Sequence, residues 1–251
     1  METSLQMFLI VCPLVFLAGM VDSIAGGGGL ISLPAYLIAG VPPHLALGTN
    51  KLSSAVGTVV STVRYCRHMP VHPLLALLSI AFALTGSACG SSLALLTDER
   101  LLRNLMILVL PVMAVVVFSN KRPPDTEESP YSTLRLAVTI SGIAFVVGGY
   151  DGFYGPGTGT FLLLLLMGLC KFGVRQSSAY SKVVNLSSNL AALTVFLLNG
   201  KAVVPLGLCA AAFSIAGHYI GAGIVLKRGY RAVRPVVLVV LALLFLKLIL
   251  G

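Results

Sequence analysis

The chain alternates long apolar runs with short polar stretches along its whole length. Most runs approach the roughly 20 residues that a helix needs to cross a bilayer, whereas two of them are far shorter. This pattern predicts an all-α, polytopic membrane protein. The apolar runs cover residues 5–21, 30–39, 45–63, 73–96 and 101–118, and then residues 134–148, 161–169, 177–198, 203–226 and 233–250.

A polar segment at residues 119–132 separates the first five runs from the last five. We therefore predict a first transmembrane repeat at residues 1–118, a cytoplasmic linker at 119–132 and a second transmembrane repeat at 133–251. The two short runs each follow a glycine-rich stretch. We interpret each as a short helix that rises from a hairpin recessed near the membrane midplane, where irregular backbone is tolerated if it lines a cavity or is buried in protein.

The two halves also match position by position. Aspartate and glycine positions recur 129 residues apart, and lysine, glycine and arginine positions recur 131 residues apart. A general likeness between apolar helices does not explain paired aspartates and lysines. Because five is an odd number, repeats of five segments must be inverted relative to each other. The matched pairs are Asp22/Asp151, Gly26/Gly155, Gly28/Gly157, Lys51/Lys182, Gly86/Gly217, Gly90/Gly221 and Arg103/Arg234.

Charge supports the membrane assignment and predicts an orientation. Only 10% of residues are charged, against about 25% in a soluble domain. The net charge of +9 comes from basic residues in short connections, and no basic face with interleaved aromatic residues is available for nucleic acid. If Arg64 faces the cytoplasm, alternation places both termini outside. It leaves Arg100, Arg103, Lys201 and Lys247 outside and puts Arg67, Lys121, Arg122, Arg135, Lys171, Arg175, Lys227, Arg228, Arg231 and Arg234 inside.

Two alternatives at the level of the whole chain are weaker. Residues 5–21 could be a signal peptide, but they lack a basic n-region and their counterpart lies in mid-chain. The five cysteines show neither a CxxC motif nor a Cys/His spacing, so we expect no metal site and no cofactor.

The glycine stretches are the first candidate for chemistry. Each begins an apolar helix, and a helix N-terminus with unpaired N–H groups attracts anions. We predict that Gly26, Gly27, Gly28 and Gly29, together with Gly155, Gly157 and Thr158, contribute to a substrate site. The alternative is that glycine only allows close helix packing, which is our interpretation of Gly86/Gly90 and Gly217/Gly221.

Two lysines at matched depths are the second candidate. A charged residue inside a membrane span is a functional candidate by default, although Lys51 and Lys182 could instead snorkel to an interface. Polar residues continue along the same helical faces, and their hydroxyls could alternatively bond their own helix. The faces comprise Lys51, Ser54 and Thr58 in one half and Lys182, Asn185 and Asn189 in the other, with Asn50 and Ser181 beside the lysines.

Asp22 and Asp151 precede the glycine stretches and are candidates for coupling. They could carry protons, because desolvation disfavours a charged carboxylate, or they could be permanent partners of the lysines or helix caps. His44 and His218 also lie in or near spans. A lone histidine is more often an ordinary hydrogen-bonding residue than a proton shuttle.

Residues 22–33 (DSIAGGGGLISL) and 42–54 (PPHLALGTNKLSS), with the later Arg64-Tyr65 pair, resemble the TauE/SafE family of sulfite and organosulfonate exporters. The second half is looser, with Gly155-Pro156-Gly157-Thr158-Gly159 in place of the plain glycine run and Tyr180-Ser181-Lys182 in place of Thr-Asn-Lys. The resemblance implies an inner-membrane permease for a sulfur-containing or carboxylate-like anion.

We therefore expect a secondary transporter that exports a small sulfur-containing anion across the cell membrane, coupled to a proton or to the membrane potential. An anion channel or a permease for a small carboxylate on the same scaffold is the alternative, and a homo-oligomer is compatible with either. An enzyme fits poorly, because the glycine run lacks a Gly-Lys-Ser/Thr ending and neither HExxH nor GxSxG occurs.

Overall fold

The computed structural model describes residues 4–98 and 129–250, and these residues form helices and short connections without any strand. The predicted all-α polytopic fold is confirmed. The fifth apolar run, Arg103 and most of the linker lie outside the described residues, so the repeat boundaries stay predictions. The helices are α1 (Leu5–Ala25), α2 (Gly29–Ile38), α3 (Pro43–His68), α4 (Pro73–Leu96), α6 (Thr133–Phe153), α7 (Thr158–Leu169), α8 (Val174–Leu198), α9 (Val204–Arg228) and α10 (Tyr230–Leu250).

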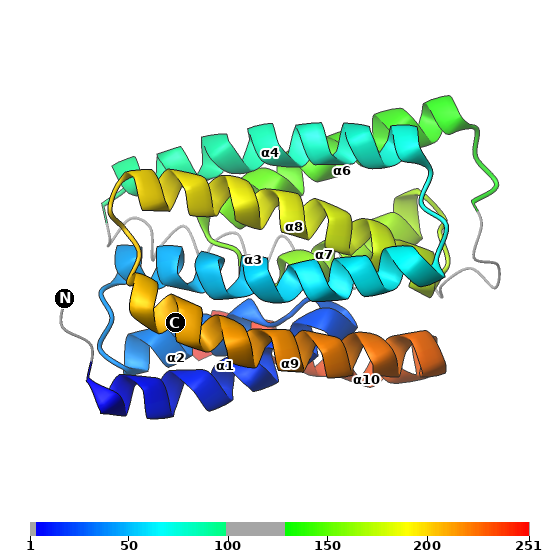
Figure 1. Cartoon of the computed structure of the whole chain (residues 1–251). Coiled ribbons are helices and arrows are strands. Elements are labelled where there is room, and N and C mark those ends of the chain that lie inside the picture. The colour runs from blue at the N-terminus through cyan, green and yellow to red at the C-terminus, as the bar shows by residue number, and fades with distance from the viewer. Residues whose placement is uncertain (1–3, 99–128, 251) are drawn as a thin grey trace.

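Five of the described helices, α1, α4, α6, α8 and α9, are long and apolar enough to cross a membrane. Helix α3 has the length but not the hydropathy, because it carries buried polar residues such as Thr49, Asn50 and Ser61. A polar face inside a membrane protein must be turned toward other helices rather than toward lipid. Helix α3 accordingly lies in the interior of the bundle (Figure 1).

Each short helix folds back along the long helix before it. In the first hairpin, Gly26 caps α1 in the left-handed conformation (φ +80°), and Gly28 then packs against Ala18 and Asp22 of α1. In the second, Gly155 and Gly157 have φ of +99° and +83°. L side chains rarely adopt these angles, which explains glycine at these turns. The hairpins start from opposite ends of the bundle, as inverted repeats require (Figure 1).

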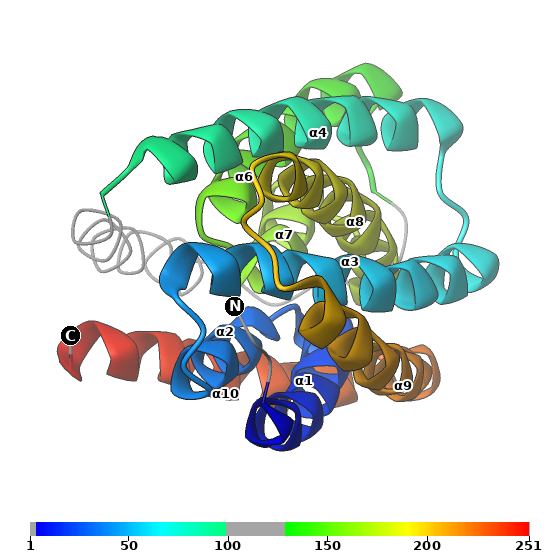
Figure 2. The same cartoon turned by 60° about the vertical axis from the view of Figure 1, so that its left-hand side comes forward.

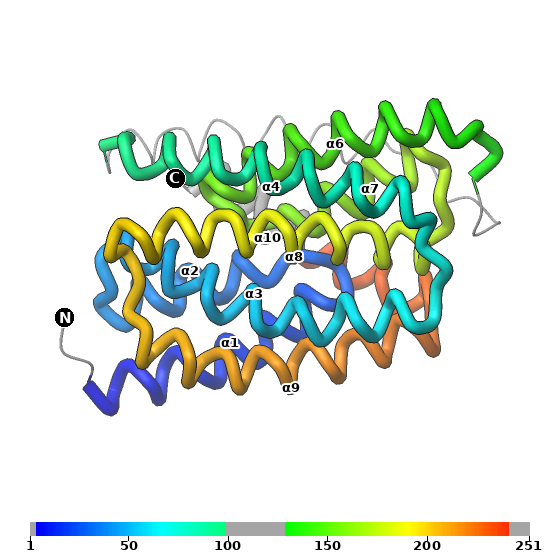
Figure 3. Tube along the Cα trace, turned by 45° about the horizontal axis from the view of Figure 1, so that its top comes forward, coloured from blue at the N-terminus to red at the C-terminus, as the bar shows by residue number. Residues whose placement is uncertain are grey.

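The long helices form a row that interlocks the two repeats. Helix α4 packs on α6 and α8, α3 packs on α8 and α9, and α9 packs on α1. The order is therefore α6–α4–α8–α3–α9–α1, with an approximate two-fold axis between α8 and α3 (Figure 3). Figure 2, which views α8 and α9 nearly along their axes, shows α8 between α4 and α3. The first long helix of each repeat thus packs on the fourth helix of the other.

Small residues allow the helices of the two repeats to pack closely against each other. Gly86 and Gly90 of α4 lie against the backbone of Phe145 and Gly149 in α6, and Gly217 and Gly221 of α9 lie in the same way against α1. A Cβ atom at any of the four would overlap the partner helix. The predicted packing role of these glycines is confirmed.

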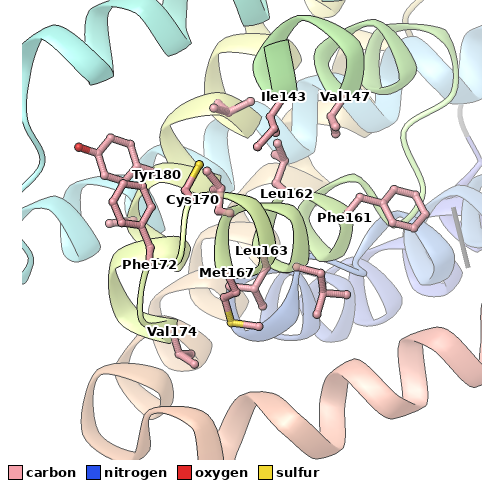
Figure 4. Close-up of a cluster of buried hydrophobic side chains, with 14 of the residues drawn as sticks. Ile143, Val147, Phe161, Leu162, Leu163, Met167, Cys170, Phe172, Val174 and Tyr180 are labelled. Carbon is pink, nitrogen blue, oxygen red and sulfur yellow. The ribbon is translucent and has the colours of Figure 1, made fainter. Parts of the chain in front are cut away.

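Helix α7 is apolar on all sides and is buried accordingly. Phe161, Leu162 and Met167 of α7 pack with Ile143 and Val147 of α6 (Figure 4). The following turn is held by Phe172, whose ring stacks on that of Tyr180 with centroids 5.0 Å apart. This packing holds α7 against α6 and the turn that follows α7 against α8.

Candidate functional site

The two hairpin turns meet at the centre of the molecule. Gly26 lies directly against Gly159, and a Cβ atom on either would overlap the other backbone. Thr160 Oγ1 donates a hydrogen bond to the Ala25 carbonyl (2.7 Å), and Gly29 lies against Pro156. The turn that breaks the helices of each repeat therefore packs against the backbone of the corresponding turn in the other repeat.

Lys51 of α3 pairs with Asp151 of α6 beside the second turn. Lys51 Nζ lies 2.8 Å from Asp151 Oδ2, and both residues are 2% exposed. Ser188 of α8 donates a second hydrogen bond to the same carboxylate oxygen (2.6 Å). Gly155 passes next to the Lys51 amine, close enough that a Cβ there would lie 3.1 Å from Nζ. This ion pair is fully enclosed.

Lys182 of α8 forms the corresponding pair with Asp22 of α1. Lys182 Nζ donates to both the Oδ2 and the backbone carbonyl of Asp22, each at 2.6 Å. His218 of α9 adds a further contact, with Nε2 3.1 Å from Asp22 Oδ2. The Asp22 side chain is 15% exposed, so this pair is less enclosed than the other.

Each lysine thus neutralises the carboxylate of the opposite repeat. Both amines are buried on carboxylates and neither reaches a helix end, so the structure differs from the snorkelling alternative. Opposite charges in a low-dielectric interior attract strongly, but taking both out of water is costly. The gain is realised here because each carboxylate also accepts a second hydrogen bond.

Two small cavities flank Asp22. One, of about 20 Å³, is lined by Asp22, Gly28, Gly29, Ser32, Ser54 and His218, with Val15, Ala18, Gly19 and Ser214. The other, of about 10 Å³, includes Gly26, Gly159, Ser181 and Lys182 in its lining. The first has room for about one water molecule. An oxyanion is larger, so helices must move before one can occupy this site.

The remaining predicted site residues are divided. Asn50 is buried with its Oδ1 atom lacking a hydrogen-bond partner among the described residues. Asn185 accepts a hydrogen bond from Asn189 (2.6 Å), and Thr158 bonds back to the Gly155 carbonyl (2.6 Å). Gly27 does not join the cluster, because it packs against Val240 of α10.

Sequence reasoning gave little weight to His218 and missed Ser188, which complete the two carboxylate sites. One signal was available. Gly217 is the repeat partner of Gly86, so His218 corresponds to Ser87. A polar position that breaks the internal symmetry next to a matched glycine marks a difference between the halves. Residues 4–98 and 129–250 hold no group of three His, Cys, Asp or Glu side chains placed to bind a metal ion.

Comparison with known proteins agrees with this architecture. Residues 11–248 match the family described as Sulfite exporter TauE/SafE. The chain belongs to the TauE/SafE family. It is 32% identical to a probable membrane transporter protein of Haemophilus influenzae (99% of this chain, 97% of that one) and 33% identical to the probable membrane transporter protein YfcA of Escherichia coli K12 (99% and 94%).

A more distant relative, the probable membrane transporter protein YdhB of Bacillus subtilis, is 27% identical over 70% of this chain and 73% of its own. The resemblance expected from the glycine and lysine motifs is confirmed. This TauE/SafE protein is a multi-pass membrane transporter.

Proposed function

We propose that this TauE/SafE protein is a secondary transporter that exports a small sulfur-containing anion, sulfite or an organosulfonate, through the site between its two repeats. One observation carries the proposal. Two buried ion pairs, Lys51–Asp151 and Lys182–Asp22, cross between the repeats where the glycine turns interrupt the helices. Interrupted helices at the interface of inverted repeats are the usual location of a substrate site in secondary transporters.

The lining chemistry favours an anion. A ligand entering the larger cavity beside Asp22 meets the start of α2 at Gly28 and Gly29 and the Ser54 side chain. A helix start carries a partial positive charge and N–H groups free to bind an oxyanion. Lys182 lies across the Asp22 carboxylate and would gain a second anionic partner when that carboxylate moves aside.

The inverted arrangement also suggests how the site alternates. Because the two ion pairs are related by the repeat, opening one hairpin toward each face would expose each pair in turn. An inside-negative potential contributes about 2.3 kcal/mol per 100 mV for each negative charge that leaves the cell, which favours export.

The orientation proposed with this function has both termini outside the inner membrane. The connection between α3 and α4, the start of α6, the connection between α7 and α8 and the α9–α10 turn all lie at one end of the bundle (Figure 1). These segments and the helix ends next to them carry Arg64, Arg135, Lys171, Arg175 and Lys227, whereas Lys201 follows α8 at the other end. Basic connections face the cytoplasm.

The test is substrate-induced thermal stabilisation of the purified protein with sulfite, sulfate, thiosulfate, sulfoacetate, taurine and small carboxylates. A ligand at 100 times its Kd stabilises the folded state by about 2.7 kcal/mol. We expect a shift with at least one sulfur oxyanion, reduced in Lys182→Ala, Lys51→Ala and the milder Ser54→Ala, and unchanged in Lys201→Ala, whose lysine is exposed. A folded wild-type protein that no anion stabilises would contradict the proposal.

Flux measurements separate the alternatives. A carboxylate permease would respond to the carboxylates and to no sulfur oxyanion. An anion channel would conduct without saturating and without exchanging labelled for unlabelled anion, whereas a carrier does both. The enclosed ion pairs and the one-water cavity favour a carrier, because a conducting pore needs a continuous path.

A further inference from the structure

The two carboxylate sites are related by the repeat but differ at two positions. His218 contacts Asp22, and its counterpart near Asp151 is Ser87. Gly57 packs against His218, and its counterpart is Ser188, whose hydroxyl bonds Asp151. A histidine with a facing glycine in one half thus replaces two serines in the other. The substitutions are coupled, because a side chain at position 57 would occupy the space of the imidazole ring.

The pocket around His218 is shaped for the ring. A Cβ on Gly19 would lie 2.8 Å from His218 Nδ1, and one on Gly57 would lie 2.6 Å from it. The ring is 2% exposed and lies between α1 and α3. Gly19 of α1 and Gly57 of α3 therefore both leave space beside Nδ1, and a side chain at either position would fill that space.

Both protonation states of His218 find hydrogen-bond partners in this pocket. When the ring is neutral, Nε2–H donates to Asp22 Oδ2 (3.1 Å) and Nδ1 accepts from the Ser214 hydroxyl (3.3 Å). When the ring is charged, Nδ1–H donates instead to the Ser214 carbonyl (2.9 Å). A buried polar atom without a hydrogen-bond partner is costly. In both states each nitrogen of the ring has a partner. The pocket therefore offers Nδ1 a hydrogen-bond partner whether or not this nitrogen carries a proton.

The charged groups around the ring determine the net charge of this cluster. Asp22 faces it from α1, and Lys182 of α8 already neutralises that carboxylate. From α3, Thr58 faces the ring, and Arg64 lies further along, at Gly223. From α10, Arg231 lines a separate cavity with Lys227, nine residues beyond His218 on α9 and so about 13 Å along the helix. The charged ring therefore adds one net positive charge to the Asp22 cluster.

The same ring lines the cavity that holds Ser54 and the start of α2. A positive imidazolium at this wall attracts an anion in the cavity, and by reciprocity the anion raises the affinity for the proton. We propose that His218 binds the proton of the transport cycle and that the proton and the anion bind together. This inference rests on the proposed anion transport. The direction of net flux then follows the combined anion, proton and voltage gradients.

The first measurement uses the wild-type protein and sulfoacetate, whose sulfonate group stays ionised. Histidine changes its charge between about pH 5 and 8. The charged form favours the anion, so apparent affinity from thermal stabilisation should fall as pH rises, by at most about tenfold per pH unit for one linked proton. Affinity that changes less than about twofold across this range would overturn the inference while leaving anion transport intact.

The second measurement compares variants in proteoliposomes. His218→Gln retains a donor for Asp22 but does not titrate, and His44→Gln is the matched control on α3. We expect wild type and the control to alkalinise the lumen when sulfoacetate leaves it, as reported by a trapped pH dye. His218→Gln should lose this proton movement, and any exchange of labelled for unlabelled sulfoacetate that it retains should need a higher anion concentration, because the positive ring no longer attracts the anion. Proton movement in His218→Gln equal to that of wild type would refute the assignment.

Two outcomes distinguish this inference from the proposed function. If the wild type neither binds nor moves any anion of the panel, the proposed function fails and the inference fails with it. If the wild type moves sulfoacetate without a proton, only the inference fails. The binding measurement on wild type decides the question even where a variant is unstable.

Discussion

Each lysine of the site meets the carboxylate of the opposite repeat, and the two charges depend on each other. Lys51 and Asp151 are both buried, and water cannot solvate either one if the other is removed. Breaking a buried ion pair on one side typically costs about 3–5 kcal/mol, whereas removing both partners costs much less.

The first prediction is a double-mutant cycle. Lys51→Gln and Asp151→Asn should each lower the free energy of unfolding by about 3–5 kcal/mol, and the double variant should recover much of that loss. Because the chain has no tryptophan, circular dichroism is the suitable readout for unfolding in detergent. Lys201→Gln is the exposed control. A double variant as unstable as both singles combined would show that the two charges are not coupled.

The second prediction concerns glycine at the turn. Gly26→Ala places a Cβ in the Gly159 backbone at a φ of +80°, so it should strongly lower the melting temperature and the yield of folded protein. Gly142→Ala is the matched control, since a Cβ at Gly142 in α6 meets nothing within 4 Å. Alanine there should be neutral or stabilise by up to about 1 kcal/mol. Equal melting temperatures for the two variants would contradict the contact between the two hairpin turns at Gly26 and Gly159.

At the scale of elements, glycine contacts hold the first helix of each repeat against the fourth helix of the other. Gly217 and Gly221 bring α9 onto the α1 backbone near Met20, and this contact places His218 beside Asp22. Close packing of backbones is the main attraction between apolar helices in a lipid environment. The α1–α9 interface therefore positions the proposed proton site.

The third prediction tests that dependence. Gly217→Leu should push α9 away from α1, lower stability and weaken the pH dependence of anion binding, because His218 then loses its contact with Asp22. Ile220→Leu on the exposed face of the same helix should leave both unchanged. Thermal stabilisation by sulfoacetate at two pH values measures both effects. An unaltered pH dependence of anion binding in Gly217→Leu would show that the α1–α9 interface does not position the proposed proton site.

At the scale of the molecule, the inverted repeats give the bundle one basic end. The helix ends and connections at that end carry Arg64, Arg67, Lys171 and Lys227, and the chain enters α1 from the opposite end (Figure 1). Such an asymmetry sets membrane orientation because basic connections are retained on the cytoplasmic side.

The fourth prediction is therefore topological. In intact cells, a membrane-impermeant maleimide should label Lys201→Cys in a background without other cysteines. It should not label a variant that retains only the exposed Cys66, which lies near the basic end of α3. Both sites should react after the membrane is permeabilised. The reverse labelling pattern would invert the proposed orientation.

The features that depend on local chemistry could be predicted from the order of the residues. Long apolar runs predicted the membrane helices, and four consecutive glycines marked a break that no helix tolerates well. The paired aspartates and lysines identified the residues of the central cluster, and the spacing of Gly86/Gly90 and Gly217/Gly221 identified the packing faces. The glycine signals lie within a few residues of the features that they specify, and the aspartates and lysines stand out because charged side chains are rare in membrane spans.

Which residues pair with each other depends on long-range packing and could not be predicted in this way. By chemistry alone Asp22 could pair with Lys51 or Lys182, and the fold selects Lys182, 160 residues away, because α1 and α8 approach each other at the crossed hairpins. Gly27 reads like its neighbours in sequence, yet it packs on α10. Nothing in the sequence next to His218 indicates a special role, but in the fold Gly19, Gly57 and Asp22 surround its ring. These contacts join residues far apart in the chain, so the local pattern around His218 does not predict them. They make His218 the position at which the two carboxylate sites differ.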